Sequence, residues 1–349
     1  MSTYFAIGLM SGTSLDGLDI CYSQFVKNNG TWSFNILNSE TIPYTSNWEN
    51  RLKNAIYISS EELLELNADY GFYLGEKVNE FIQKFNITTV DVIASHGHTV
   101  FHNPSKRYTL QIGDGRAIKQ LTHIPVIYDF RSQDVLLGGN GAPLVPIGDQ
   151  LLFSEFDACI NLGGFSNISL IQDNKRIAFD ICPVNIVLNK YANILGKNYD
   201  ANGAFARKGI INNFVLEQLN HLDFYKKKHP KSLGIEWCNL ELFPLLKDME
   251  AIDVLATITE HSAIQISNTL NQFQLKKVLF TGGGSYNQFL IEKIQAKFSG
   301  KIIIPNKTII NFKEALIFAF MGVLRKNNEI NVLSSTTGSS HNHSSGLIA

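Results

Sequence analysis

Apolar positions along this chain follow two different periods, which predict a fold of alternating strands and helices. Residues 4–26 read as a hairpin, because an apolar strand, a polar loop ending in Asp16-Gly17 and an alternating strand follow one another. Period-2 or short continuous apolar runs predict further strands at 32–44, 90–95, 108–112, 125–128, 158–162, 167–171, 176–179, 277–280 and 301–304. Apolar residues at helical spacing predict helices at 61–85, 116–121, 252–270, 288–298 and 314–325.

The order of these elements suggests a duplicated design. A strand, a turn of small residues and a returning strand occur near the start of each half, around residues 11–17 and again around 163–166. Between the halves, residues 129–146 are polar and rich in glycine, which predicts a domain boundary there. The final segment, 331–349, is rich in Ser, Thr, Gly and Asn, and predicts a loosely held tail.

Composition narrows the class of protein. The chain has 349 residues, of which 44% are hydrophobic and 17% charged, enough for about two globular domains. A formal net charge of -1 gives no general attraction to nucleic acid or to an anionic membrane, and the basic run 226–231 reads as a solvated loop. The apolar run at 315–324 is too short to span a bilayer. No basic and apolar leader precedes the first strand, so we expect no signal peptide.

The cysteines bear on the cellular compartment. The four cysteines are far apart and form no C-x-x-C pair, which favours reduced thiols and a cytoplasmic protein. The sequence does not fix the oligomeric state, and a homodimer is one arrangement that it leaves open.

Three glycine-containing turns carry the candidate chemistry. In the first, Gly12 and Gly17 permit left-handed backbone, and Ser11, Thr13 and Ser14 add hydroxyls to a loop whose N–H groups could surround an anion. No G-x-x-x-x-G-K-[ST] sequence occurs, so a phosphate site here would differ from a P-loop, and a plain tight turn is the alternative. Residues 282–284 lie between a strand and a helix, where glycines either admit a phosphate or flat ligand or only pack the helix on the strand.

Two phosphate hairpins followed by a late glycine turn resemble the layout of the actin, sugar-kinase and heat-shock-chaperone ATPase superfamily. Within it, the chain resembles the anhydro-N-acetylmuramic acid kinases through an ordered set of motifs from about residue 4 to residue 325. These motifs are Gly8 to Asp19, Ser95 to Thr99, Gln111 to Gly113, Asp129 to Arg131, Gly138 to Pro146, Asn161 to Asn167 and Thr281 to Gly284.

The resemblance implies an α/β fold of two RNase H-like domains with an active-site cleft between them. Residues 1–130 with 312–349 would form the N-terminal lobe, and 131–311 the C-terminal lobe. It also implies a reaction, in which ATP phosphorylates O6 of 1,6-anhydro-N-acetylmuramic acid while water opens the anhydro bridge. The product, N-acetylmuramic acid 6-phosphate, belongs to cell-wall recycling, and the partners would be this small sugar and ATP rather than nucleic acid or membrane.

The resemblance further implies the nucleotide contacts. The residues expected to bind ATP are Gly12, Thr13, Ser14, Leu15, Asp16, Gly17, Leu18, Asp19, Gly163, Gly164, Ser166, Gly282, Gly283 and Gly284. No direct metal ligand is expected, and Mg²⁺ would be held through water near Asp16 or Asp19, since this ion commonly keeps several waters.

Asp180 matches the family's catalytic aspartate. We expect it to end a strand and to act as a general base that takes a proton from the attacking water. The alternative is an aspartate that only caps backbone N–H groups. Glu314, at the predicted start of the last helix, either answers the helix dipole or faces substrate as an acidic residue of the family does.

Arg131, His96 and His98 are the remaining substrate candidates. A guanidinium binds a carboxylate or phosphate bidentately, so Arg131 could hold the lactyl carboxylate of the sugar; a salt bridge with Asp129 or Asp134 is the alternative. The two histidines are expected to contact sugar hydroxyls. Together with His102 they could also suggest a metal cluster, but their spacing and the lack of an acidic partner argue against one.

The chain departs from the family pattern beside the proposed base. Where relatives have Gly-Pro-Gly-Asn after the aspartate, this chain has Cys182-Pro183-Val184-Asn185, and Asn189 stands at a later acidic position. His98 replaces a common glutamine. These changes leave the exact sugar open. An ordinary sugar kinase and a non-catalytic, ATP-gated sugar-binding module are the alternative functions.

Overall fold

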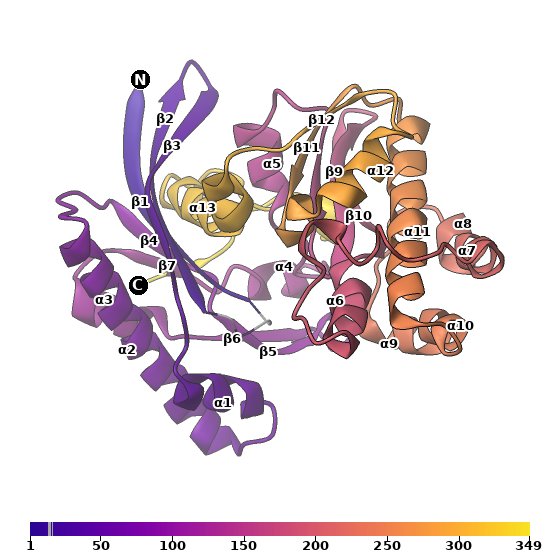
Figure 1. Ribbon diagram of the computed structural model, residues 1–349. Coiled ribbons are helices and arrows are strands. Elements are labelled where there is room, and N and C mark those ends of the chain that lie inside the picture. The colour runs from indigo at the N-terminus through magenta and orange to yellow at the C-terminus, as the bar shows by residue number, and fades with distance from the viewer. Residues whose placement is uncertain (13–14, 16) are drawn as a thin grey trace. The chain divides into compact units, whose positions relative to one another are not determined.

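The computed structural model describes residues 1–12, 15 and 17–349 (Figure 1). Its contacts divide the chain into two compact units: Met1–Phe153 with Phe312–Ala349, and Ser154–Asn311. The boundary expected at residue 131 is therefore too early, because residues 131–153 belong to the first unit. There the buried Asp149 pairs with Lys313 at 2.6 Å, so long-range polar contacts decide what local composition cannot.

A six-stranded sheet forms the first unit, in the order β13-β7-β4-β1-β2-β3. The strands are β1 (Ser2–Ser11), β2 (Leu18–Asn28), β3 (Thr31–Ile42), β4 (Val92–Ser95), β7 (Val126–Tyr128) and β13 (Leu347–Ile348). β1, β2 and β3 are antiparallel, whereas β1, β4 and β7 run parallel. A separate two-stranded ribbon of β5 (His98–Asn103) and β6 (Tyr108–Ile112) was predicted only in its second strand.

Helices pack on both faces of this sheet. On one face Ile7 and Leu9 join the core formed with the long helix α2 (Ser60–Lys84), which a Ser59/Glu62 capping box begins. On the other face lies α13 (Lys307–Lys326): a Cβ on Gly8 of β1 would meet the Ala315 carbonyl oxygen. The remaining helices of this unit are α1 (Ser46–Asn54), η1 (Pro104–Lys106), α3 (Gly115–Thr122), α4 (Ser132–Leu136), α5 (Pro146–Leu152) and α14 (Ser334–Thr337).

The second unit has a five-stranded sheet in the order β10-β9-β8-β11-β12. Its strands are β8 (Ala158–Leu162), β9 (Phe165–Gln172), β10 (Lys175–Pro183), β11 (Lys277–Thr281) and β12 (Lys301–Ile303). The apolar side chains of the sheet pack with the long helix α11 (Ala251–Gln272). The other helical segments are α6 (Asn185–Ile194), η2 (Ala201–Gly203), α7 (Asn213–Asn220), α8 (Asp223–Lys226), α9 (Ile235–Trp237), η3 (Cys238–Leu242), α10 (Phe243–Leu246), η4 (Gly283–Tyr286) and α12 (Gln288–Gln295).

The two sheets share one topology. In each, an antiparallel meander of three strands (β1-β2-β3 and β8-β9-β10) is extended from its first strand by two parallel strands (β4-β7 and β11-β12). This order confirms the predicted pair of RNase H-like α/β folds and explains why strand, small-residue turn and strand recur in the sequence. No described helix combines the length and apolar character that crossing a bilayer would require.

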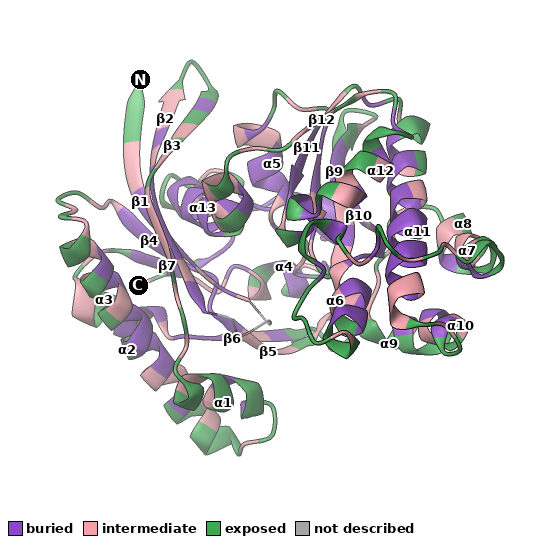
Figure 2. Ribbon diagram, in the orientation of Figure 1, coloured by how far each residue is buried: buried purple, intermediate pink, exposed green. Residues whose placement is uncertain are grey.

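Two predicted features differ from the structure. The segment 331–349 is not a loose tail: Asn331, Thr337 and Ser345 are fully buried, and β13 pairs with β7. Figure 2 marks the buried residues of each unit in purple. Its Ser and Asn side chains form buried hydrogen bonds, which composition alone does not reveal. The last helix begins at Lys307 rather than at Glu314, so Glu314 lies within the helix and is not placed to answer the dipole at its first turn.

The packing of α13 on β1 gives a stability prediction. Gly8→Ala places a methyl group 1.9 Å from the Ala315 carbonyl oxygen, a backbone atom that cannot move without displacing the helix. We expect the free energy of unfolding to fall by about 3 kcal/mol, as for severe overpacking. Denaturant unfolding measures it, with Ser33→Ala on exposed β3 as the control. Equal stability of the two variants would contradict the close contact.

Candidate active site

Parallel pairing brings the predicted loops of the first unit to one edge of its sheet. Gly12 follows β1, His96 follows β4, and Arg131 follows β7 by three residues. Because β1, β4 and β7 are parallel neighbours, their carboxyl ends lie side by side. This edge is where open α/β sheets commonly bind ligands.

The last pair of the hairpin is Ser11 and Leu18, and residues 12–17 lie between them in sequence. Gly17 approaches β3 so closely that a Cβ would lie 2.6 Å from the Ile42 carbonyl oxygen, which accounts for a glycine there. The Leu15 N–H donates to the Gly12 carbonyl at 3.4 Å. Leu18 is fully buried, so its side chain serves the core, and only its backbone could face a ligand. Asp19 accepts a hydrogen bond from Thr41 Oγ1. Thr13, Ser14 and Asp16 lie outside the described residues.

In the second unit the two glycine turns are neighbours. β8 and β11 pair in parallel with Asn161 opposite Thr281, so Gly163-Gly164 and Gly282–Gly284 leave the same edge of the sheet. Asn185 links them: its Nδ2 donates to the Leu162 carbonyl at 3.0 Å and would lie 3.4 Å from a Cβ on Gly284.

The glycines of these turns differ in how much space surrounds a Cβ added at each position. A Cβ on Gly282 or Gly284 would collide with Asn161 or Leu162. Gly282 and Gly284 therefore serve close packing of the turn against β8, which is in line with the packing role given as the alternative for this turn. At Gly164 the nearest atom to an added Cβ is 3.7 Å away, and at Gly283 it is 4.0 Å away. Packing therefore does not require glycine at either position. Open space beside backbone is what a ligand that contacts main-chain N–H groups would use.

The Ser166 hydroxyl is a second feature of this edge that suits a polar ligand. Its side chain is fully buried, and its Oγ has no hydrogen-bond partner among the described residues. A buried hydroxyl is normally satisfied, so this one fits a polar ligand atom. The expected helix N-terminus is not at the glycines, however. A 3₁₀ turn, η4, intervenes, and α12 begins after Asn287, whose side chain caps Leu290.

Asp180 lies in the same lateral row of the sheet. The pairs Asp180–Asn167, Asn167–Asn161 and Asn161–Thr281 cross four adjacent strands. At a strand spacing of about 4.8 Å, the row spans roughly 14 Å and carries a polar residue on every strand. The expectation from the sequence that Asp180 ends its strand is wrong. β10 continues to Pro183, and a bulge between Asp180 and Cys182 interrupts the register instead.

The Asp180 carboxyl is held by the segment that follows α8. Oδ2 accepts the Leu233 N–H at 2.8 Å, and the Asp180 N–H donates to the Lys231 carbonyl at 3.0 Å. Burial raises the pKa of Asp180, and the Leu233 hydrogen bond opposes that shift. The basic run is therefore not only a solvated loop, because Lys231 lies over the Phe224 ring at 4.5 Å beside the candidate base.

His96 holds Arg131 instead of facing a sugar. Its Nε2 accepts hydrogen bonds from Arg131 Nε at 3.0 Å and Nη2 at 2.8 Å, and its Nδ1 lies 2.9 Å from the Gly97 carbonyl. Both ring nitrogens thus have protein partners. Burial, with the Arg131 charge, holds the pKa of His96 well below its usual range, so the ring is neutral and able to accept. The expectation that His96 contacts sugar hydroxyls is not supported, because its polar atoms are occupied.

Arg131 forms no salt bridge with Asp129 or Asp134, the two partners considered as the alternative to a ligand. Nη1 donates to the Gly141 carbonyl, and Asp134 instead accepts the Gly141 N–H at 2.7 Å. Asp129 Oδ1 accepts the Ser132 N–H at 3.2 Å. Burial lowers the pKa of Arg131 to about 10, so the guanidinium remains charged near neutrality. Three of its five N–H groups have acceptors among the described residues, which leaves two that a ligand could use.

His98 ends a hydroxyl network that reaches the start of the 12–17 loop. Its Nδ1 lies 3.2 Å from Ser11 Oγ, which accepts from Tyr44 at 2.8 Å; Tyr44 and Tyr70 hydroxyls lie 2.6 Å apart. Burial lowers the pKa of His98 to about 4, so this ring is also neutral. Neither Tyr44 nor Tyr70 lies in a motif, so neither was singled out from the sequence as a site residue.

Glu314 belongs with Arg131 in the first unit. Glu314 is an exposed residue, yet the protein atoms around its carboxyl raise its pKa by desolvation, and the nearby charges of Arg131 and Lys313 oppose that shift. The described residues contain no cluster of His, Cys, Asp and Glu suited to a metal.

Comparison with known proteins decides the family. The model of the anhydro-N-acetylmuramic acid kinase family matches residues 4–349. The anhydro-N-acetylmuramic acid kinase of Aliivibrio fischeri is 37% identical over 83% of each chain. That of Haemophilus influenzae is 32% identical over 100% of this chain and 98% of its own. This chain belongs to the anhydro-N-acetylmuramic acid kinase family.

The family membership accounts for the motifs that converge on the two sheet edges. Among solved structures, the (R)-2-hydroxyglutaryl-CoA dehydratase component A of Acidaminococcus fermentans is similar at 12% identity, with a TM-score of 0.47 over 91% of this chain and 97% of that one. That likeness is too remote to inform function. Asn161, Asn167 and Asn185 were not singled out as site residues, although two of them lie in a family motif; their place in the row depends on strand register.

The burial of His96 and His98 gives a titration prediction. An unfolded histidine binds a proton near pH 6.5, whereas the pKa of folded His98 is about 4. The unfolded state therefore takes up more protons as pH falls, and stability is lost between about pH 6.5 and 4. NMR of ¹⁵N-labelled protein should show neither ring protonated at pH 6. A midpoint above 6 for both rings would contradict the buried, neutral assignment.

Proposed function

We propose that this protein transfers the γ-phosphate of ATP to O6 of 1,6-anhydro-N-acetylmuramic acid while water opens the anhydro bridge, giving N-acetylmuramic acid 6-phosphate. The observation that carries the proposal is the full-length family match, because relatives named for this activity share 31–37% of their residues with it over most of the chain.

The second unit offers the features that suit a nucleotide. The open space at Gly164 and Gly283 admits phosphate or ribose against backbone, and the orphaned Ser166 hydroxyl can donate to a phosphate oxygen. In the first unit, the 12–17 loop would contribute further N–H donors. Mg²⁺ would be held through water near Asp16 or Asp19, and the ATP complex supplies the phosphoryl group that is transferred.

Asp180 is the proposed general base. The water oxygen bonds to C1, the C1–O6 bond breaks, O6 bonds to the γ-phosphorus, and ADP leaves. The water proton passes to the Asp180 carboxylate. Desolvation suits this role, because a raised pKa makes the carboxylate a stronger base toward the water proton. The Leu233 N–H fixes Oδ2, so one oxygen is held and the other can accept the proton.

Arg131 is the proposed ligand of the lactyl carboxylate. It keeps a full charge, it is held on one side by His96, and it retains two N–H donors. His98 and Glu314 are proposed to contact the sugar. Cytoplasmic location and a homodimer stay predictions.

The test is a kinase assay with ATP over a panel of anhydro and open muramic acids and amino sugars. The proposal expects the anhydro muramic acid to be phosphorylated with the gain of one water, read by mass spectrometry. Phosphorylation of open sugars alone would favour an ordinary sugar kinase. Binding of sugar and ATP with no product would favour a non-catalytic module.

The base assignment predicts the effect of Asp180→Asn. An amide cannot take the water proton, so turnover should fall at least about 10³-fold, within the range for loss of a general base, with ATP affinity unchanged. Asp173→Asn, in the exposed β9–β10 turn, is the matched control. In the wild type, kcat/KM should fall as pH drops through a pKa above the ordinary 3.8 of an aspartate. Undiminished turnover in Asp180→Asn would refute the assignment.

The glycine turn predicts a contrast between two neighbouring variants. Gly283→Ala fills open space, so unfolding free energy should change by less than about 0.5 kcal/mol while ATP affinity falls. Gly284→Ala would place a Cβ 2.8 Å from Leu162 and should destabilise the fold first. Calorimetry and denaturant unfolding separate these effects. Unchanged ATP affinity in Gly283→Ala would remove this turn from the nucleotide site.

A further inference from the structure

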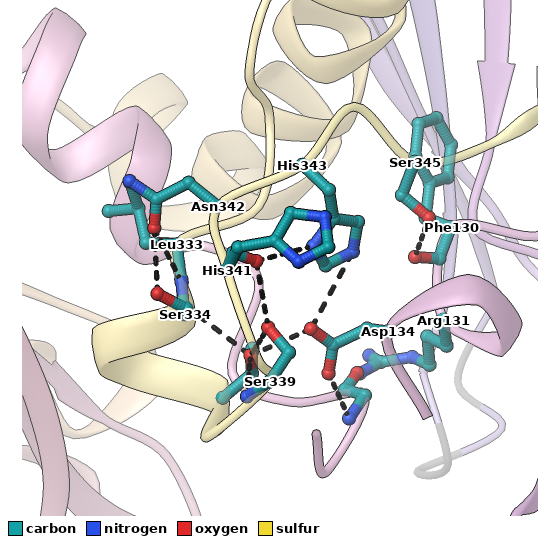
Figure 3. A network of polar contacts seen from close by, with 12 residues as sticks. Phe130, Arg131, Asp134, Leu333, Ser334, Ser339, His341, Asn342, His343 and Ser345 are labelled. Carbon is teal, nitrogen blue, oxygen red and sulfur yellow. Dashed lines mark hydrogen bonds and ion pairs between the residues drawn. The ribbon is translucent and has the colours of Figure 1, made fainter. Parts of the chain in front are cut away.

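The C-terminal segment 331–345 folds over the loop that carries Arg131 (Figure 3). Thr337 Oγ1 donates to Asp134 Oδ1 at 2.7 Å, and Ser345 Oγ donates to the Phe130 carbonyl at 2.7 Å. These bonds join residues 203 and 215 positions apart in sequence. Backbone bonds add to them, from Asn140 N to the Thr337 carbonyl at 2.8 Å and from Ser340 N to the Leu137 carbonyl at 3.1 Å.

Asp134 is the centre of this arrangement. It is fully buried, and its two oxygens serve different parts of the chain: Oδ2 accepts the Gly141 N–H, and Oδ1 accepts Thr337. His343 Nε2 lies 3.6 Å from the same Oδ1. A buried carboxylate needs several donors, and the C-terminal segment provides the side-chain donor that completes the set.

Gly141 connects Asp134 to the guanidinium of Arg131 through its two backbone hydrogen bonds. Its carbonyl accepts Arg131 Nη1, and its N–H is fixed by Asp134. A Cβ at Gly141 would lie 2.9 Å from Val135, so the loop has little freedom there. His96 fixes the other edge of the guanidinium. The orientation of the two remaining N–H donors therefore depends on a chain that runs from Thr337 through Asp134 and Gly141 to Arg131.

We propose that the C-terminal segment 331–345 positions Arg131 for the carboxylate of the substrate, with Thr337 and Asp134 as positioning residues. This rests on the proposed function, in which Arg131 binds the lactyl carboxylate. A segment that only stabilised the fold would affect all ligands alike. A segment that aims the guanidinium affects ligands with a carboxylate more than ligands without one.

The experiment compares two sugars: 1,6-anhydro-N-acetylmuramic acid, and 1,6-anhydro-N-acetylglucosamine, which lacks the lactyl group. Calorimetry gives both dissociation constants for the full-length wild type, Thr337→Val, Thr337→Ser and Arg131→Ala. Thr337→Val removes the hydroxyl with little change of shape. It should weaken binding of the carboxylate sugar about tenfold, as for loss of one hydrogen bond to a charged group, and of the other sugar less than about twofold. Thr337→Ser should restore the wild-type preference.

Control variants distinguish the positioning role of segment 331–345 from the proposal that Arg131 binds the carboxylate. Ser340→Ala alters an exposed side chain of the same segment and should leave both affinities unchanged. Ser345→Ala, which frees the Phe130 carbonyl, serves if Thr337→Val does not fold, and should show the same selective loss. Equal losses for both sugars, or none, would overturn the positioning role while a selective loss in Arg131→Ala left the carboxylate assignment intact. No selective loss in Arg131→Ala would overturn both.

Discussion

Parallel pairing of central strands is the constraint on which the candidate site depends. In the first unit it sets the ends of β1, β4 and β7 beside one another, and in the second the ends of β8 and β11. Residues far apart in sequence, such as Gly164 and Gly283, become neighbours only through this register. A shift of one residue in a strand would turn its side chains to the opposite face, so the hydrophobic core also fixes the polar row that includes Asp180.

Burial then determines the chemical state of each polar group along these edges. The same desolvation that raises the pKa of Asp180 lowers those of His96, His98 and Arg131. A stronger carboxylate base and neutral imidazoles follow from this one physical cause. The guanidinium keeps its charge against the same effect, because the pKa of Arg131, lowered to about 10, is still well above neutrality. His96 illustrates the result: a protonated ring could not accept from Arg131, so keeping the proton off Nε2 keeps the cation in place.

Local periodicity and short apolar runs predicted many of the strands and the long helices. The strands 108–112 and 158–162 coincide with β6 and β8, and the long helices α2 and α11 were placed within about two residues. Long-range contacts decided the rest. Residues 129–146 are polar and rich in glycine, and residues 331–349 are rich in Ser, Thr, Gly and Asn, features typical of linkers and tails. Yet buried partners such as Asp134 and Thr337 bond to one another across the chain.

The sequence motifs predicted part of the candidate site as well. The motifs indicated which residues gather, because each glycine turn follows a strand. They did not indicate which glycines serve packing, as Gly282 and Gly284 do, and which leave space, as Gly283 does. Nor could spacing distinguish a histidine that contacts a ligand from His96, which serves Arg131. That distinction depends on which polar atoms already have partners.

The account rests on a carboxylate that activates water beside a carbohydrate. The most direct test follows the oxygen of that water during phosphorylation of the anhydro sugar in H₂¹⁸O. Samples are quenched after short times, and unlabelled product incubated equally long corrects for spontaneous exchange at C1. The account predicts one ¹⁸O at C1 for each phosphate transferred to O6, with none in the phosphate. Phosphorylated sugar without label at C1 would contradict it.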